Sequence, residues 1–313
     1  MLKWPRSVTM VRHGYSVANE HRLEKIEGYD EFREKFEKEL EALTPAIHAR
    51  RLFPSNELRE MAARILEKYA PDFNDYDTKL TDEGWRQARV TGKKLPGVAP
   101  KPKIIYYSPY QRTRETLEGL MDGWPELKGV KRAEDDRLRE REHGRTSIYG
   151  DWRLNSVFNP QAALLYKISE HYEFRQPNGE NVMDTRDRIR SFISTLIREH
   201  GGLPQTWKDQ MMVGLHEFSQ GGVVEKAVKL AGVKADTVSE DVMLVTHGLT
   251  ILAMKSVFDR WDREKFTYEH HNNLPVNCGV TIYRGKESDP GRSRQGRHGR
   301  LILDPKENNM KLY

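Results

Sequence analysis

The sequence is poor in cysteine and in long apolar runs. Its single cysteine, Cys278, allows no disulfide within the chain and no cysteine-rich zinc site. No run approaches the roughly 18 consecutive apolar residues that would span a bilayer, and the mean hydropathy is -0.80, which excludes an integral membrane protein. The first dozen residues hold no continuous apolar stretch of signal-peptide length. We therefore expect a cytoplasmic protein in a reducing compartment.

Charge is nearly balanced, with 52 Lys and Arg against 47 Asp and Glu, for a net charge of +5. Acidic and basic residues are mixed through most of the chain, so we expect neither a nucleic-acid nor a membrane partner, and a pocket for an anionic small molecule fits the excess. Residues 285–300 are basic and rich in glycine, but they lack the aromatic residues that stack on single-stranded nucleic acid. We expect a single domain over 1–284 and a basic C-terminal tail over 285–313.

Short apolar or β-branched runs alternate along the chain with segments of helical periodicity. The runs predict strands over 8–11, 104–107, 130–133, 242–245 and 278–283. The periodic segments predict helices over 82–95, 109–123, 184–200, 223–231 and 249–258, with Thr81 and Ser108 as N-caps of the first two. Strands that alternate with helices at this spacing predict an α/β sandwich with a mainly parallel sheet.

Residues 21–75 interrupt this alternation. Apolar residues recur there at helical spacing over 32–43 and again over 58–69, and Pro45 and Pro71 should end the two patterns. The segment is typical of a two-helix insertion. We expect this insertion to roof a pocket, with a homodimer contact or a peripheral bundle as the alternative interpretation.

Four polar groups stand where a predicted strand or loop meets a helix or turn: Arg12-His13-Gly14, Arg112, Glu140 and His247-Gly248. Ligands of open α/β sheets bind beyond the carboxyl ends of the strands, so these groups can converge although they lie far apart in the sequence. Two arginines, two histidines and one carboxylate are a set expected for metal-free transfer of a phosphoryl group.

Each residue type has a defined role in that chemistry. The guanidinium forks of Arg12 and Arg112 match the oxygens of a phosphomonoester and stabilise the charge that builds there during transfer. A nitrogen of His13 can attack phosphorus and hold it covalently, provided that this nitrogen is unprotonated. His247 opens a helix, where it can donate a hydrogen bond to the phosphoryl oxygens.

The leaving alkoxide needs a proton, and Glu140 is the candidate acid because a carboxyl group beside a dianion has a raised pKa. Glu142 shares the same turn, and the residues alone do not choose between the two. Taken singly, a histidine after a strand is more often a structural hydrogen bonder, and Arg112 more often a solvated helix charge. His270 and His271 could suggest a metal, but no HExxH pattern or clustered carboxylates accompany them, so we expect no metal.

Six segments, in order, resemble the signatures of the histidine phosphatase (phosphoglycerate mutase-like) superfamily. Val11-Arg12-His13-Gly14-Tyr15-Ser16-Val17-Ala18-Asn19 is similar to its Arg-His-Gly-x-Ser-x-x-Asn signature. The others are Leu80-Thr81-x-x-Gly84-x-x-Gln87-Ala88, Ser108-x-x-x-Arg112-x-x-x-Thr116, Leu138-x-Glu140-x-x-x-Gly144, Gly179-Glu180-Asn181 and Val245-Thr246-His247-Gly248. Arg-His-Gly alone is a weak signal, whereas the ordered series is specific.

The resemblance implies a three-layer sandwich with a mixed, mainly parallel sheet flanked by helices. It also implies metal-independent hydrolysis of a small-molecule phosphomonoester through a phosphohistidine on His13, with no cofactor. It assigns Glu140 rather than Glu142 as the acid. The other residues that it places around the phosphate and the pocket rim are Arg12, Gly14, Ser16, Asn19, Arg112, Arg141, His247 and Gly248. Tyr15 and Asn181 replace the family's common Glu and Ser, which affects the rim and not the catalytic residues.

Phosphatases and mutases share these signatures. Leu138-Arg139-Glu140-Arg141 resembles the mutases' Leu-Asn-Glu-Arg, whose last arginine contacts a substrate carboxylate. The stretch from Glu140 to Gly179 is shorter than its mutase counterpart, however, and the mutases' paired substrate arginines have no clear equivalent. The run 107–117 instead resembles a fungal and bacterial phosphatase-like branch. We therefore expect a phosphatase, with interconversion of 3- and 2-phosphoglycerate as the alternative.

Segments 21–75 and 201–238 are absent from the compact core of the superfamily. We expect both to lie around the pocket mouth or at an interface, where insertions usually set substrate choice. A catalytically silent module that binds a phosphorylated ligand remains a further alternative. The presence of both His13 and Glu140 favours the enzyme.

Overall fold

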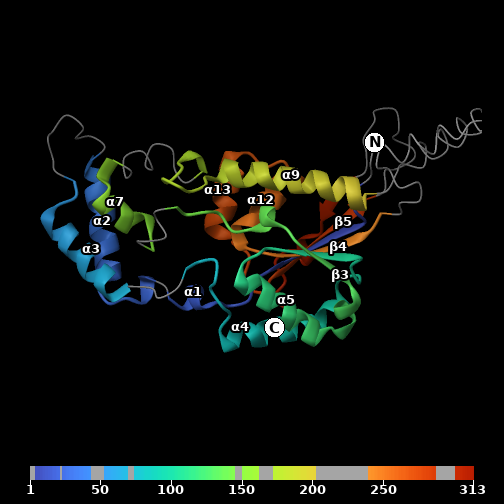
Figure 1. Cartoon of the computed structure of the whole chain (residues 1–313). Helices are drawn as coiled ribbons and strands as arrows, with labels where there is room; N and C mark the ends of the chain where they lie inside the picture. Colours follow the sequence, from blue (N-terminus) through green and yellow to red (C-terminus); the bar gives the residue numbers. More distant parts are fainter. Residues whose placement is uncertain are drawn as a thin grey trace, which may run out of the picture.

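The computed structural model describes residues 4–21, 23–43, 53–69, 74–144, 150–161, 172–201, 239–286 and 300–313. Within these ranges a six-stranded sheet has the order β3-β2-β4-β1-β5-β6 (Figure 1). Its strands are β1 (Ser7–Arg12), β2 (Ile104–Tyr107), β3 (Lys131–Glu134), β4 (Asp241–Thr246), β5 (Val280–Lys286) and β6 (Arg300–Leu303). The first four strands are parallel, β5 is antiparallel to β1, and β6 is antiparallel to β5. The predicted mixed, mainly parallel sheet is confirmed.

Helices cover both faces of the sheet (Figure 1). α9 (Val182–His200), α12 (Gly248–Phe258) and α13 (Arg263–Asn272) lie on one side, and α4 (Asp82–Lys94) and α5 (Gln111–Gly123) lie on the other. The remaining described helices are α1 (Val17–Glu20), α2 (Tyr29–Leu43), α3 (Asn56–Tyr69) and α7 (Trp152–Phe158). Single-turn 3-10 helices are η1 (Leu23–Lys25), η2 (Leu95–Gly97), η3 (Pro125–Gly129), η4 (Asp136–Leu138) and η6 (Pro305–Glu307). The arrangement is the predicted three-layer sandwich.

The central strands β1 and β4 are buried along their whole length and supply both cores of the sandwich. Because successive side chains of a strand point to opposite faces, their apolar residues divide between two clusters. The cluster shared with α9 and α12 takes Val8, Met10, Val242 and Leu244, and the cluster shared with α5 takes Val11, Met243 and Val245. This double burial explains why β4 reads as a continuous apolar run over 242–245 and why Thr9 is the one polar residue within the run 8–11 of β1.

Two helix starts test the predicted N-caps. Thr81 caps α4, since its side chain accepts from Gly84 N at 3.1 Å, as expected. The prediction for Ser108 is wrong, because α5 begins at Gln111 with Tyr110 as its N-cap residue. The buried Ser108 Oγ lies 2.8 Å from His247 Nε2 instead. Neither group reaches water there, so each satisfies the other.

The two helices predicted within 21–75 are present as α2 and α3, and a third helix, α7, packs with them. α2, α3 and α7 enclose their own apolar core, which contains Tyr29, Phe32, Phe36, Leu40, Leu58, Ala62, Ile65, Leu154 and Val157. We call these three helices the helical unit. Figure 1 shows it beyond α1, set apart from the layers of the sandwich. The sequence did not indicate that residues 152–158 join it, because that short segment carries no amphipathic pattern of its own. Whether the helical unit roofs the pocket stays a prediction.

The prediction of a separate C-terminal tail over 285–313 is wrong at both of its ends, because β5 extends to Lys286 and residues 300–313 pack against the sheet. Residues 300–303 form β6 and pair with β5, and Met310 pairs with Val280. Leu301 is buried in one of the two sheet cores, so an apolar strand covers what would otherwise be an open sheet edge. Residues 300–313 therefore belong to the domain, while 287–299, 202–238 and the helix predicted at 223–231 lie outside the described residues. No helix in the described ranges has the length and apolar character needed to cross a membrane.

Candidate active site

The first candidate residues stand where β1 ends. Backbone hydrogen bonds fix this point, since His13 N donates to Thr246 O (2.9 Å) and His13 O accepts from Cys278 N (3.2 Å). The buried His13 ring places Nδ1 at 2.8 Å from Gly14 O. A carbonyl oxygen only accepts, so Nδ1 carries the ring hydrogen and Nε2 keeps its lone pair. Nε2 is therefore the nitrogen that can attack phosphorus.

The second histidine stands where β4 ends and α12 begins. The His247 ring is fully buried, and its centroid lies 5.3 Å from that of His13. Its Nε2 contacts Ser108 Oγ, directly after β2, whereas its buried Nδ1 has no hydrogen-bond partner among the described residues. A Ser108 hydroxyl that donates to Nε2 leaves the ring hydrogen on Nδ1. That hydrogen can then be donated to a phosphoryl oxygen.

Two buried arginines supply positive charge at the same end of the sheet. Arg12, the last residue of β1, donates from Nη1 to Pro275 O. Arg112 lies in the first turn of α5, with its Cζ 4.8 Å from the centroid of the Tyr110 ring, and its Nη1 donates to Asp75. Both side chains are therefore held from behind by the protein.

The candidate acid, Glu140, lies on the loop that follows η4. It is half-buried, and its Oε1 accepts from Arg141 N at 2.9 Å. Threonine hydroxyls at the end of β4 and the start of α12 donate to carbonyls of this loop, in the pairs Thr246 with Leu138 (2.6 Å) and Thr250 with Arg139 (2.7 Å). These bonds tie the acid loop to the elements on either side of His247.

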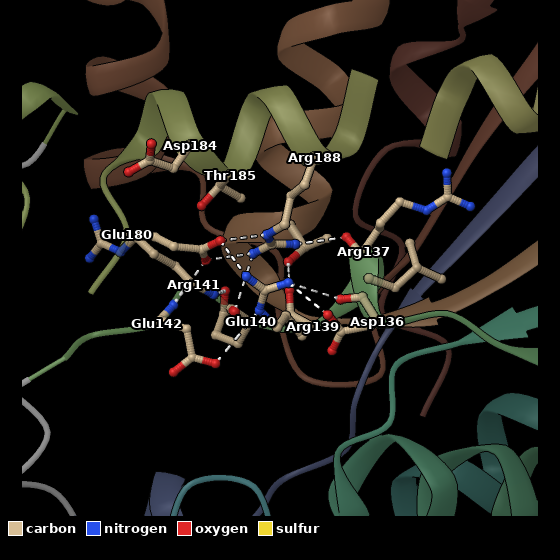
Figure 2. A network of polar contacts seen from close by, with 12 residues as sticks. Asp136, Arg137, Arg139, Glu140, Arg141, Glu142, Glu180, Asp184, Thr185 and Arg188 are labelled. Atoms are coloured by element: carbon tan, nitrogen blue, oxygen red, sulfur yellow. Dashed lines mark hydrogen bonds and ion pairs between the residues drawn. The ribbon is translucent and has the colours of Figure 1, made fainter. Parts of the chain in front are cut away.

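Behind the loop, the Glu180 carboxylate holds two arginines (Figure 2). It accepts from Arg139 Nη2 at 2.7 Å and from Arg188 Nε and Nη2 at 3.0 and 3.1 Å. Arg188, on α9, also donates to the main-chain oxygens of Arg137 (2.7 Å) and Glu140 (3.2 Å). An ion-pair network therefore anchors the backbone of the acid to α9.

Burial and the two arginine charges set the protonation states. Burial lowers the pKa of His13 well below 6.5, and the charges of Arg112 and Arg12 lower it further. Burial, followed by the charge of Arg112, lowers the pKa of His247 in the same way. Burial raises the pKa of the Glu140 carboxyl above 4.5, although both arginines oppose this. Neutral imidazoles and a carboxyl group that keeps its proton to higher pH suit phosphoryl transfer to His13.

Of the expected rim residues, Gly14 and Asn19 lie close to His13. A Cβ at Gly14 would stand 2.7 Å from Gly84 O, so only glycine permits this approach of the two segments. Asn19 Oδ1 accepts from Asn277 Nδ2 (2.9 Å) and from Ser16 N (3.2 Å). Ser16 is also the N-cap of α1. Both residues therefore make hydrogen bonds that hold the loop after His13 in place.

The remaining rim residues lie near the arginine and the acid. Gly248 is the first residue of α12, and a Cβ there would stand 3.4 Å from Arg12 Nε and from Leu274 Cδ1. Arg141 is half-buried and donates its backbone N–H to the Glu140 carboxylate. These contacts thus link Gly14 and Asn19 to the loop at His13, Gly248 to Arg12, and Arg141 to Glu140. That these residues share one phosphate pocket stays a prediction.

Sequence reasoning missed four residues around the site: Asp75, Ser108 as the partner of His247, Arg188 and Asn277. Arg188 could have been noticed in the sequence, because it lies on a predicted helix directly before Ile189, a residue of the buried apolar face. Asp75 and Asn277 lie in loops, and their roles arise from contacts that no local pattern reveals.

Within the described ranges, no group of three or more His, Cys, Asp and Glu side chains is placed to hold a metal ion. The two adjacent histidines of α13 have other neighbours. The His270 ring stacks on Phe266, and His271 Nδ1 lies 2.8 Å from Thr267 O.

A model of the histidine phosphatase superfamily (branch 1) matches residues 73–204. This match supports the resemblance to the histidine phosphatase superfamily that the six sequence segments carry. Phosphoglycerate mutase-like protein AT74 of Arabidopsis thaliana is 25% identical over 215 residues, which are 66% of this chain and 56% of that protein. The 2,3-bisphosphoglycerate-dependent phosphoglycerate mutase of Bartonella tribocorum is 29% identical over 126 residues, or 40% of this chain and 59% of that enzyme. The matches therefore span less than two thirds of either relative.

Several solved structures share the fold of this chain over nearly its whole length. The mycobacterial glucosyl-3-phosphoglycerate phosphatase with inorganic phosphate has a TM-score of 0.52 and 17% identity, and the match covers 98% of both chains. A putative alpha-ribazole-5'-P phosphatase from Escherichia coli has a TM-score of 0.52 and 12% identity, with 96% of this chain and 95% of that chain covered. At these identities the similarity shows the fold and no more.

Proposed function

We propose that this protein hydrolyses small-molecule phosphomonoesters without a metal or other cofactor, through a phosphohistidine on His13. The contact of His13 Nδ1 with Gly14 O carries the proposal, because it leaves Nε2 unprotonated beside the arginines. The second imidazole, the raised pKa of Glu140 and the match of residues 73–204 to the superfamily's model support it.

In the first half-reaction, the phosphoryl oxygens bind Arg12, Arg112 and the Nδ1 hydrogen of His247. His13 Nε2 attacks phosphorus, and the N–P bond forms as the bond between phosphorus and the leaving oxygen breaks. Glu140 gives its proton to that oxygen. In the second half-reaction, the Glu140 carboxylate takes a proton from water, whose oxygen attacks phosphorus and releases inorganic phosphate from His13.

Phosphoglycerate mutase activity is the second candidate. The curated relatives include a mutase, and Arg141 follows the acid as it does in the mutases' motif. A mutase would pass the phosphoryl group from His13 to the other hydroxyl of a phosphoglycerate and not to water. The two functions share the first half-reaction, so only the acceptor separates them.

The deciding experiment measures inorganic phosphate released from a panel of phosphomonoesters in EDTA. The panel includes 3-phosphoglycerate, with and without 2,3-bisphosphoglycerate. Release in EDTA that is lost in His13→Ala, together with an acid-labile phosphoenzyme in the native chain only, is the expected result. His271→Ala, which removes an exposed histidine of α13, is the matched control and should keep full activity.

Two other results would change the proposal. Conversion of 3- to 2-phosphoglycerate without phosphate release would make the protein a mutase. Substantial hydrolysis by His13→Ala would exclude His13 as the nucleophile.

The cellular setting stays a proposal as well. The single cysteine favours a cytoplasmic location. We retain the helical unit and residues 201–238 as the segments that set substrate choice, with a homodimer contact as the alternative role of the helical unit.

A further inference from the structure

Asp75, which no signature of the superfamily includes, lies on a turn that is docked onto the start of α5. Within the turn, Asp77 N donates to Asn74 Oδ1 (2.9 Å) and Thr78 Oγ1 donates to Asn74 O (2.9 Å). Towards α5, Gln111 N donates to Tyr76 O at 3.0 Å. The turn is therefore fixed both internally and against the helix that carries Arg112.

The docked turn also makes an aromatic contact. The Tyr76 ring meets the Tyr110 ring edge to face, with centroids 5.2 Å apart. Tyr110 lies under the Arg112 guanidinium, so one ring supports both the turn and the arginine.

The turn holds one edge of the Arg112 guanidinium. Nη1 donates to the main-chain oxygen of Asp75 at 2.6 Å and to its Oδ1 at 2.9 Å, and Nη2 approaches Oδ2 at 3.4 Å. These atoms form the end-on edge of the group. The side-on edge, made by Nε and the second hydrogen of Nη2, donates to no other described residue. An arginine can bind two oxygens of a phosphoryl group through that edge.

We propose that Asp75 is a positioning residue for phosphate binding, which fixes the end-on edge of Arg112 so that the side-on edge meets the phosphoryl oxygens. This inference rests on the proposed function. The guanidinium is held by the Asp75 carboxylate, by the Asp75 carbonyl and by the Tyr110 ring, and the carbonyl cannot leave without undocking the turn. Asp75 therefore stays in place while the phosphoryl group binds.

The opposite role would be competition, in which the Asp75 carboxylate occupies Arg112 and must be displaced by phosphate. The two roles differ in the sign of the effect. Removal of the carboxylate weakens phosphate binding if Asp75 positions Arg112, and strengthens it if Asp75 competes.

The test measures the binding of vanadate by calorimetry in EDTA, which needs no turnover. Asp75→Ala should bind vanadate about tenfold more weakly than the native protein, on the scale of a hydrogen bond to a charged group. Asp75→Asn keeps one acceptor oxygen, so its affinity should lie between those of the native protein and Asp75→Ala. Asp77→Ala is the matched control, because it removes a carboxylate of the same turn that contacts Asn74 and not Arg112. Its affinity should be unchanged.

A double-mutant cycle separates positioning from a general structural effect. Asp75→Ala should add nothing to the loss of vanadate affinity seen in Arg112→Ala, since the Asp75 carboxylate accepts its hydrogen bonds from that arginine. Tighter binding by Asp75→Ala, unchanged binding, or a further loss in the double variant would each overturn the inference. If the native protein binds vanadate and hydrolyses phosphomonoesters, and Asp75→Ala binds vanadate equally well, this inference alone is refuted. If the native protein neither binds vanadate nor hydrolyses phosphomonoesters, the proposed function is refuted together with this inference.

Discussion

The helical unit and the carboxyl end of the sheet draw their residues from the chain in different ways. The helical unit is built from long amphipathic stretches whose apolar side chains meet one another, such as Phe36 with Trp152 at 5.3 Å between ring centroids. The carboxyl end of the sheet is built from single polar residues that follow four different strands. Apolar periodicity predicts the first kind of structure, whereas the second kind becomes visible only once the strands are placed side by side.

The largest expected effect concerns the catalytic end alone. Glu140→Gln should slow hydrolysis of alkyl phosphates by about 10²- to 10⁴-fold, because the leaving alkoxide then lacks its proton donor. Hydrolysis of nitrophenyl phosphate, whose leaving group needs little protonation, should slow far less. Steady-state kinetics on both esters measures the difference, with Glu142→Gln as the matched control on the same loop. Equal slowing of the two esters would argue against Glu140 as the acid.

The next effect tests whether the two regions are energetically separate. Phe36→Ala in the helical unit and Phe192→Ala in the sheet core each remove a fully buried ring, which costs about 3–5 kcal/mol. Phe36→Ala should lower amide protection in α2, α3 and α7 only, while Phe192→Ala should lower it in β1 and β4 as well. Hydrogen exchange read by mass spectrometry compares the two. Loss of protection in β1 from Phe36→Ala would show that the regions unfold together.

A smaller effect concerns the network behind the acid loop. Glu180→Gln should lower kcat/KM by roughly 10- to 100-fold, since Arg188 then loses its carboxylate partner and the Glu140 backbone can shift. The loss should be larger for alkyl than for nitrophenyl phosphate, because positioning of the acid is affected and phosphate binding is not. Glu199→Gln, at an exposed carboxylate of α9, the helix that carries Arg188, is the control. An equal loss on both esters would point to general damage to the pocket.

The smallest effect is a pH dependence of stability that should divide the two regions. The unfolded chain protonates His13 and His247 near pH 6.5, but the folded chain, where burial lowers both pKa values, does not. Stability is therefore complete above pH 6.5 and falls as the pH drops below it. Exchange should speed up in β1 and β4 below pH 6.5, and less so in the helical unit, whose described residues contain no histidine. His247→Asn should reduce the difference, and an unchanged pH profile in that variant would refute the assignment.

The sequence predicted those parts of the molecule that depend on local pattern or on the order of motifs. The short apolar or β-branched runs at β1 and β4 and the cap at Thr81 are such features, and His13 and Glu140 follow from the motif series. The parts that it did not predict depend on long-range contacts. Ser108 is of a residue type that favours an N-cap, yet it contacts the buried His247 ring. No pattern in the sequence near Asp75 shows that its carboxylate contacts Arg112.

The sequence also did not predict the pairing of β6 with β5, for a related reason. The segment 300–303 is too short to stand out beside a basic, glycine-rich stretch, and only the open edge of β5 gives it a place in the sheet. The same holds for α7, whose Leu154 and Val157 find apolar partners only in the helical unit.

The position of β4 in the sheet also governs when the site can exist. β1 and β2 do not pair with each other; both pair with β4, whose residues enter the chain more than 130 positions after β2. During synthesis the two halves of the pocket must therefore wait for this late strand before they can be joined. Contacts of such large sequence separation close slowly. Catalytic competence is consequently one of the last properties that the growing polypeptide acquires, since neither Ser108 nor His13 meets His247 until the central strand has been inserted between their own.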